Sequence, residues 1–211
     1  MTPEHASDLT RQVCELAPVV PVLVIDDASM AEGLAKALIA GGLPALEVTL
    51  RTPAALEAIA EMAKVPGGVV GAGTLLTAKD VEAAKLAGAV FGVSPGATER
   101  LLDACEANDL PLLPGAATST EVMRLLERGY KMQKFFPAEA NGGAKALKAI
   151  GTPLPKVKFC PTGGITLENA NDYLSLANTI CVGGSWVAPA NLVRAGDWAA
   201  ITALAAEASM L

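Results

Sequence analysis

The stretch GVVGAGTLLTAKDVEAAKLAGAVFGVSP, from Gly68 to Pro95, contains the repeating unit on which the fold depends. It begins with a short apolar run that ends in GAGT. An alanine-rich helical pattern follows, which Thr77 is suited to cap, and a second apolar run closes the stretch. This order of patterns predicts two parallel strands that are joined by a helix.

The same unit recurs along the chain at intervals of roughly 20 to 25 residues. Strands are predicted at residues 19–25, 45–50, 68–74, 89–95, 110–115, 131–137, 156–161 and 179–184. Eight strands that are each followed by a helix predict an α/β fold of the (β/α)8 class, a TIM barrel. A doubly wound open sheet is the alternative, but it usually has about five or six such units.

Two further helices complete the predicted fold, one before the first strand and one over about residues 197–208. No low-complexity linker and no shift of composition divides the chain. Residues 1–211 are therefore predicted to form a single (β/α)8 barrel domain with an extra N-terminal helix.

The composition excludes several classes of protein. The chain has 211 residues, of which 52% are hydrophobic and 18% charged, as is typical of a globular protein. A net charge of −6 disfavours nucleic-acid binding. The longest apolar run, residues 17–25, is too short to span a membrane and contains two prolines. The polar N-terminus is unlike a signal peptide, so we expect a cytoplasmic protein with no membrane partner.

Cysteine and histidine usage limits the chemistry. The cysteines Cys14, Cys105, Cys160 and Cys181 are widely spaced and form no CxxC pair, which favours buried thiols over disulfides or a zinc site. His5 is the single histidine and lies in a polar segment, where we expect it to be solvated. A Ser-His-Asp or Cys-His mechanism is excluded unless His5 serves it. Carboxylates, lysine, tyrosine or cysteine must carry any acid–base chemistry, and no metal is expected.

Polar side chains alternate with aliphatic ones in the second predicted strand. Glu47, Thr49 and Arg51 share one face and are expected to point into the barrel. A buried glutamate needs a cationic partner, which Arg51 or Lys134 could supply. A structural ion pair that braces two strands is the alternative to a catalytic role.

Lys134 lies in KMQKFFPAE, beside two of the four phenylalanines of the chain. Aromatic neighbours and low water access disfavour a charged ammonium group. A neutral amine in a cavity can attack a ketone and form a Schiff base. Lys131 is expected on the opposite face of this strand, although a bulge would exchange the two roles. Lys156 and Lys158 on the next strand are expected to face outward.

Two glycine pairs follow the seventh and eighth strands, in PTGGI (161–165) and VGGSW (182–186). Barrels often bind phosphate with these two loops, because glycine lets backbone N–H groups approach the oxygens. Ser185 can add a hydroxyl. Plain tight turns are the alternative for either pair.

The motifs LEVTLRT, VGAGT, SPG, KFFPAEANGG, FCPTGGI and GGSW resemble those of the 2-keto-3-deoxy-6-phosphogluconate (KDPG) aldolase family, in the same order and with similar spacing. The resemblance extends from about Pro18 to the C-terminus. It implies a class I, metal-independent aldolase without a cofactor. Such an enzyme cleaves a phosphorylated keto-deoxy sugar acid to pyruvate and glyceraldehyde 3-phosphate in the Entner–Doudoroff pathway. The resemblance also implies a homotrimer.

The resemblance assigns roles by position. Lys134 matches the Schiff-base lysine and Glu47 the general acid/base. The implied binding residues are Arg51 and Thr74 for the carboxylate, Pro95 and Phe136 beside the pyruvyl group, Thr162 near the sugar hydroxyls, and Gly163, Gly164, Gly184 and Ser185 for the phosphate. PGAAT (114–118) carries alanines where relatives often have a more polar run.

Other functions stay open at this stage. Related aldolases act on the 6-phosphogalactonate epimer or on 4-hydroxy-2-oxoglutarate, and Schiff-base chemistry would also allow decarboxylation of oxaloacetate. From the residues alone, a phosphate-binding isomerase or synthase could use Glu47 as its base and Lys134 as an electrostatic clamp. A non-catalytic phospho-ligand-binding barrel would need the anion site but not a desolvated amine.

Overall fold

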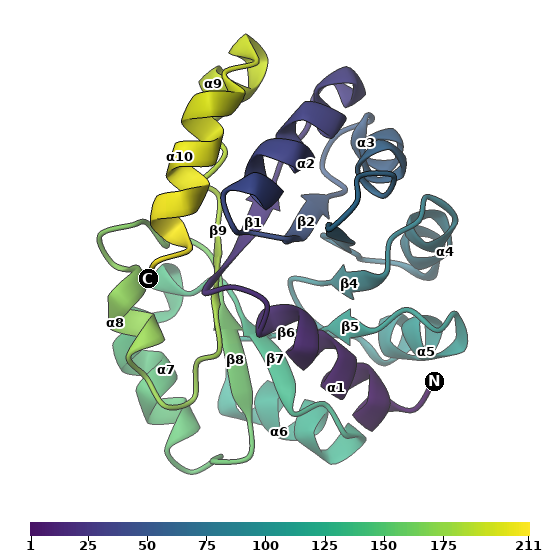
Figure 1. Cartoon of the computed structure of the whole chain (residues 1–211). Coiled ribbons are helices and arrows are strands. Elements are labelled where there is room, and N and C mark those ends of the chain that lie inside the picture. Colours follow the sequence, from purple (N-terminus) through teal and green to yellow (C-terminus); the bar gives the residue numbers. More distant parts are fainter.

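The computed structural model describes all residues from Met1 to Leu211 and consists of alternating strands and helices (Figure 1). The strands are β1 (Val19–Leu23), β2 (Ala45–Thr49), β3 (Val69–Gly73), β4 (Phe91–Val93), β5 (Leu112–Leu113), β6 (Gly115–Ala116), β7 (Met132–Phe135), β8 (Lys158–Pro161) and β9 (Val182–Gly184). The helices are α1 (Pro3–Cys14), α2 (Ala31–Ala40), α3 (Ala55–Met62), α4 (Ala78–Leu86), α5 (Glu99–Ala107), α6 (Ser119–Arg128), α7 (Gly143–Gly151), α8 (Ala170–Leu174), α9 (Ala190–Ala195) and α10 (Trp198–Ala208), with 3₁₀ turns η1 (Ala28–Met30) and η2 (Glu139–Asn141).

Each of the eight predicted strand positions contains a strand, and the fifth is divided in two. Pro114 separates β5 from β6 and has no N–H to donate to a ladder. The two pieces pair with different neighbours, β5 with β4 and β6 with β7.

The strands form a curled parallel sheet. One part has the order β5-β4-β3-β2-β1-β9 and the other β6-β7-β8. Two isolated parallel bridges, Phe159 with Thr179 and Thr162 with Gly183, join the β8 region to the β9 region. The order follows the chain without the reversal of a doubly wound sheet, so that alternative is wrong. The helices surround the strands (Figure 1).

Threonine residues cap four of the helices, and three of these caps are at residues that the sequence predicts. The Thr77 hydroxyl accepts from Asp80 N at 3.2 Å at the start of α4, and the Thr98 hydroxyl accepts from Leu101 N at 3.3 Å at the start of α5. At α6 a capping box pairs Thr118 with the third helical residue. Each cap fixes where the chain leaves a loop at the end of a strand, which is where the pocket described below is built.

The alternation of side chains divides the core into two layers. The larger, outer layer lies between helices and sheet and includes Leu46 and Val48 of β2. The smaller, inner layer lies inside the curled sheet and consists of Cys14, Val20, Ala45, Phe91, Val93, Leu113, Met132, Cys160 and Cys181. Inward positions of different strands therefore meet in one apolar interior.

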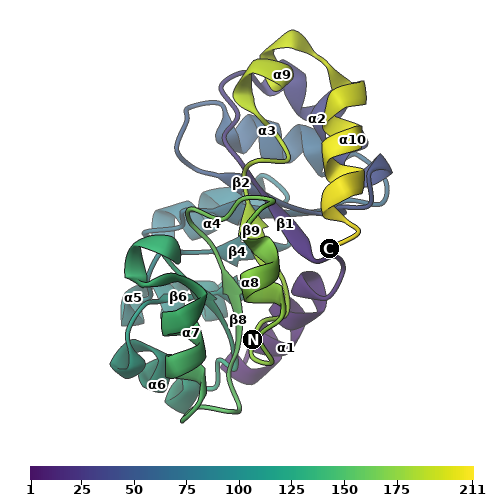
Figure 2. The same ribbon diagram turned by 90° about the vertical axis from the view of Figure 1, so that its left-hand side faces the viewer.

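The predicted N-terminal helix is present and lies at the amino end of β7. The Ser7 hydroxyl accepts from the backbone N–H groups of Lys131 and Met132, each at 2.9 Å. Cys14, the last residue of α1, reaches the inner layer. The predicted C-terminal helix is α10, which packs against α2 (Figures 1 and 2). None of these helices is both long and apolar enough to cross a membrane.

Candidate active site

A pocket of about 380 Å³ opens at the carboxyl ends of the strands. Its lining consists of Val22, Val24, Arg51, Thr74, Pro95, Phe136, Thr162, Gly163, Gly164, Ile165, Gly183 and Ser185. Most predicted binding residues are in this set, although they come from six separate strand ends. The parallel sheet explains this convergence, because the carboxyl ends of all its strands lie at one edge.

Lys134 and Glu47 form a buried pair inside the sheet. The Nζ atom of Lys134 lies 3.2 Å from Oε1 of Glu47, and the residues are 4% and 3% exposed. The Lys134 Nζ also lies 5.2 Å from the centroid of the Phe136 ring, and Phe136 lines the pocket. Neither Lys134 nor Glu47 lines the pocket itself, but the Phe136 ring connects the amine to it, and the amine lies beside a carboxylate that can exchange a proton with it.

The other lysines are placed differently. Lys131 is exposed and lies just before β7. β7 is therefore regular, and no bulge exchanges the positions of Lys131 and Lys134. Lys158 has the parity of Cys160, but it lies at the amino end of β8, where its Nζ donates to the Ala177 carbonyl at an exposed site, as an outward-facing lysine would. Lys134 is therefore the inward-facing lysine next to the pocket.

Glycine on β3 makes room for the Glu47 side chain. A Cβ atom on Gly73 would lie 2.3 Å from Oε1 of Glu47 and 2.7 Å from its Cγ. Gly73 and Thr49 are paired across β2 and β3, which places the glycine beside the glutamate. The GAGT motif therefore shapes the site as well as ending a strand.

Arg51 supplies the cationic group of the pocket. Its Nε donates to the hydroxyl of Thr74 at 3.3 Å. Thr74 has a φ of 62°, a left-handed conformation that costs a β-branched residue free energy. The bend turns the chain at the end of β3 and places the Thr74 hydroxyl next to the guanidinium.

The loop after β8 presents unpaired donors. Gly163 and Gly164 have φ values of 104° and 78°, which glycine adopts without strain. The carbonyls of Thr162 and Gly163 accept from Ala138 N and Glu139 N, at 2.8 and 3.0 Å, which fixes the loop. The backbone N–H groups of Gly163, Gly164 and Ser185 donate to no other protein atom. Such a set of free N–H groups suits an anion.

Gly184 differs from the other predicted phosphate residues, since it does not line the pocket. A Cβ there would lie 1.9 Å from the Trp186 ring, so in this structure the glycine accommodates that ring. Gly183 lines the pocket instead, and a Cβ on it would lie 2.3 Å from the Thr162 hydroxyl.

Three apolar residues of the lining were not predicted: Val22, Val24 and Ile165. Val22 and Val24 belong to an apolar run that carries no polar signal. The one clue was the register of the strands. The inward-facing side chains of the first barrel strand must reach the same interior as those of the second strand.

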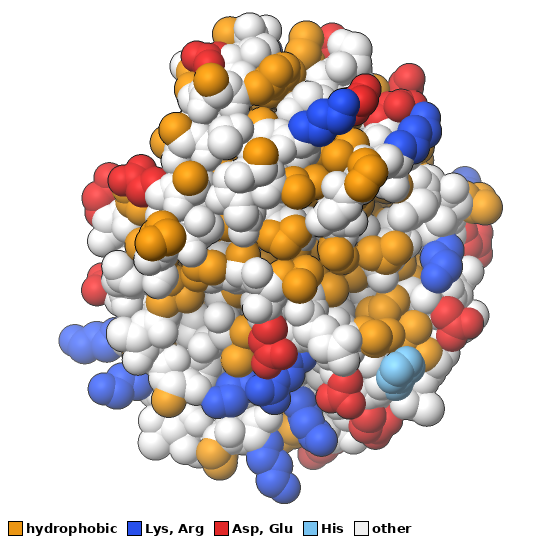
Figure 3. All heavy atoms as spheres, viewed as in Figure 1, with side chains coloured by type: hydrophobic (Ala, Val, Ile, Leu, Met, Phe, Trp, Pro, Cys, Tyr) orange, Lys and Arg blue, Asp and Glu red, His pale blue; other side chains and the backbone are white.

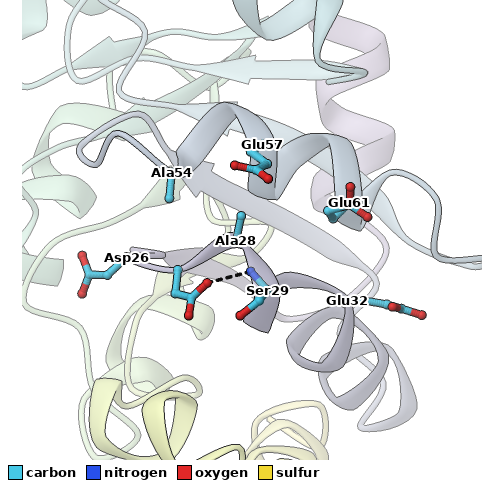
Figure 4. A pocket seen from close by; sticks show the side chains of 8 residues that line it. Asp26, Ala28, Ser29, Glu32, Ala54, Glu57 and Glu61 are labelled. Atoms are coloured by element: carbon cyan, nitrogen blue, oxygen red, sulfur yellow. Dashed lines mark hydrogen bonds between the residues drawn. The ribbon is translucent and has the colours of Figure 1, made fainter.

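A second cavity, of about 570 Å³, has the opposite electrostatic character. Figure 4 shows the carboxylates of Asp26, Glu32, Glu57 and Glu61 around it, and Asp27, which accepts from Ser29 N at 2.9 Å, also lines it. Carboxylates repel a phosphorylated acid, so this cavity does not suit such a ligand.

The face on which α1 lies carries apolar side chains across its middle (Figure 3), including the exposed Leu16 and Val90.

Fold and site together define a class of protein: an α/β protein with a curled parallel sheet, a buried lysine–carboxylate pair, and a neighbouring pocket that contains an arginine and free backbone N–H groups. Residues 10–204 match the family "Aldolase: KDPG and KHG aldolase", and the chain belongs to that family.

Individual relatives agree with the family assignment. The 2-dehydro-3-deoxy-phosphogluconate aldolase of Pseudoalteromonas atlantica is 54% identical over 94% of this chain and 93% of its own. The crystal structure of the Zymomonas mobilis ZM4 2-keto-3-deoxy-6-phosphogluconate aldolase with 3-phosphoglycerate has a TM-score of 0.90 at 54% identity, covering 94% of this chain and 93% of that one. The Legionella pneumophila KDPG aldolase, with pyruvate captured as a covalent carbinolamine, has a TM-score of 0.91 at 46% identity, covering 94% and 97%.

Proposed function

We propose that this chain is a class I aldolase that cleaves 2-dehydro-3-deoxy-6-phosphogluconate to pyruvate and glyceraldehyde 3-phosphate through a Schiff base on Lys134. The observation that carries the proposal is the buried Lys134 amine, 3.2 Å from Glu47 and 5.2 Å from the Phe136 ring, which lines a pocket with free N–H donors. A non-catalytic anion-binding protein would have no use for this buried pair. The covalent carbinolamine of the Legionella relative supports the same chemistry here.

Substrate binding is proposed to fix the bond that breaks. Arg51 and Thr74 hold the carboxylate, while Pro95 and Phe136 contact the pyruvyl portion. At the other end the N–H groups of Gly163, Gly164 and Ser185, with the Ser185 hydroxyl, hold the phosphate, and Gly184 supports this loop. Thr162 contacts a sugar hydroxyl between them. Anchoring both ends orients the C3–C4 bond next to Lys134.

The proposed reaction begins when neutral Lys134 attacks the C2 ketone. Glu47 donates and accepts protons while the carbinolamine loses water and becomes a cationic iminium. The iminium accepts the electron pair of the C3–C4 bond as the C4 hydroxyl loses its proton, and glyceraldehyde 3-phosphate leaves. Protonation of the enamine at C3 and hydrolysis then release pyruvate. The iminium is the electron acceptor, so the mechanism requires neither metal nor cofactor.

The architecture that we propose for this site is a closed (β/α)8 barrel formed by residues 1–211 as one domain. Closure is supported by the bridges between the β8 and β9 regions and by Pro114, whose carbonyl accepts from Lys134 N at 2.8 Å. The chain is further proposed to form a homotrimer, for which the exposed apolar side chains around α1 offer a surface. Native mass spectrometry tests the trimer directly.

Trapping with pyruvate tests the covalent step. The protein is incubated with pyruvate, reduced with borohydride, digested, and mapped by peptide mass spectrometry. We expect one adduct, on Lys134, that is absent in Lys134→Ala and retained in Lys131→Ala, the matched exposed control. An unmodified, folded wild-type protein would refute the aldolase mechanism, and an adduct on Lys131 would refute the residue assignment.

Substrate comparison tests the phosphate site. Cleavage of the phosphorylated gluconate-series acid is expected to exceed that of its 6-phosphogalactonate epimer and of 4-hydroxy-2-oxoglutarate. The last compound carries no phosphate, so Ser185→Ala should raise KM for the phosphorylated acid and leave KM for 4-hydroxy-2-oxoglutarate unchanged. Equal changes for both compounds would place Ser185 outside the phosphate site.

A further inference from the structure

Three of the four cysteines meet inside the sheet, although they are distant in sequence. Cys14 ends α1, Cys160 lies on β8, and Cys181 precedes β9. Their sulfur atoms all lie within 4.8 Å of one another, and none of the residues is more than 3% exposed. Cys105, the fourth cysteine, belongs to the outer layer of the core. The proposed aldolase reaction uses none of these thiols.

The spacing of the three sulfurs is close to what a shared ion requires. Thiolates bind a metal at about 2.3 Å, so three sulfurs lie about 4 Å apart around a planar centre and somewhat closer around a pyramidal one such as trivalent arsenic. Sulfurs within 4.8 Å of one another reach that separation through small side-chain movements. We propose that Cys14, Cys160 and Cys181 form a three-thiolate binding site for a soft, thiophilic ion, and that trivalent arsenic is the species that fits it best.

The surroundings select the kind of ion. Apolar side chains enclose the thiols, namely Val20, Ala45, Phe91, Val93, Leu113 and Met132. The Thr162 hydroxyl lies 3.9 Å from the Cys160 sulfur. Hard cations such as Mg²⁺ and Ca²⁺ require several oxygen ligands, and structural zinc requires four donors. Three sulfurs without a fourth ligand suit a three-coordinate thiophilic centre.

Charge favours a trivalent centre over Cu(I). Three thiolates around a monovalent ion leave two negative charges in an apolar interior, which is costly to bury. Arsenous acid, As(OH)₃, is uncharged and reacts with three thiols to give As(S-Cys)₃ and three water molecules. Arsenic keeps its +3 oxidation state, each thiol proton leaves in a water molecule, and the product is neutral.

Cys160 is paired with Lys134 across β7 and β8, so a bound ion would lie next to the proposed Schiff-base lysine. We expect arsenite to slow aldol cleavage as a secondary effect.

Native mass spectrometry with arsenite tests the site. The folded protein, kept reduced with a phosphine, is incubated with sodium arsenite. We expect a gain of one arsenic atom with the loss of three hydrogens in wild type and in the control Cys105→Ser. Cys14→Ala should lose the adduct or bind with the loss of only two hydrogens. Absence of an adduct in folded wild type, or an unchanged three-hydrogen adduct in Cys14→Ala, would overturn the proposal.

A second measurement tests the proposed site even if the Cys14→Ala variant fails to fold. Arsenic X-ray absorption on the wild-type adduct counts the sulfur neighbours of the ion directly. Three sulfurs support the site, and two or fewer overturn it. Neither readout depends on catalysis, so the outcome is independent of the proposed aldolase function.

Discussion

Replacing Gly73 by alanine should disable the proposed acid/base by displacing it. The new Cβ would lie 2.3 Å from Oε1 of Glu47 and 2.9 Å from its Cδ. A carbon–oxygen contact normally needs about 3.3 Å or more, so the carboxylate must move by about 1 Å. Glu47 is buried and its Oε1 lies 3.2 Å from Lys134, so this movement alters the pair itself.

Two magnitudes follow from that displacement. A 1 Å misplacement of a reacting group costs up to about 10²-fold in rate, so kcat for pyruvate release should fall by roughly that factor. Overpacking a well-packed interior costs roughly 1–3 kcal/mol, which should appear in the free energy of unfolding. The rate is measured by a coupled assay for pyruvate and the stability by urea denaturation.

A matched control and a double mutant isolate the cause. In Gly68→Ala, just before β3, the closest atom to the Cβ is the flexible end of Ile39 at 3.1 Å, and the Val65 carbonyl lies at an ordinary contact distance of 3.6 Å. That variant should keep its kcat and lose less than about 1 kcal/mol. In a Glu47→Ala background the stability cost of Gly73→Ala should largely disappear. An equal cost in both backgrounds would refute the proposed clash.

Three further predictions concern other parts of the molecule. Ser7→Ala leaves the N–H groups of Lys131 and Met132 without their acceptor, so the free energy of unfolding should fall by roughly 1–3 kcal/mol per unsatisfied donor in urea denaturation; an unchanged midpoint would contradict this. Ser185→Ala should raise KM for the phosphorylated substrate roughly tenfold, with little change in kcat, because a hydrogen bond to a charged group is lost. Burial raises the pKa of the Cys105 thiol to about 12. The unfolded chain therefore loses that proton first as pH rises, and stability should fall between about pH 9 and 12 by up to about 1.4 kcal/mol per pH unit, a slope that Cys105→Ala should reduce in urea denaturation series.

Local patterns were sufficient to predict much of the fold. Strand and helix patterns repeat in the sequence, and threonines such as Thr77 mark helix starts, so positions of elements followed from short-range signals. The alternation that placed Glu47 inside is likewise local. The division of the fifth strand at Pro114 was missed, although proline in a central strand is itself a warning.

Features that depend on long-range register were harder to predict. Val24 lines the pocket only because β1 lies between β2 and β9, and nothing in its own neighbourhood indicates this. The meeting of Cys14, Cys160 and Cys181 has the same origin, since a helix end, a strand and the residue before another strand converge from distant parts of the sequence.

The glycines that face large side chains have a consequence for directed evolution of this pocket. Gly73 accommodates Glu47, and Gly183 accommodates Thr162, each from the neighbouring strand. A library that randomises only the larger side chains of the pocket lining would leave the space set by Gly73 and Gly183 unchanged. One that mutates the glycines singly would mostly recover inactive clones. Productive variants should instead arise as pairs, for example when a larger residue at 183 accompanies a smaller one at 162, so libraries should encode both positions together.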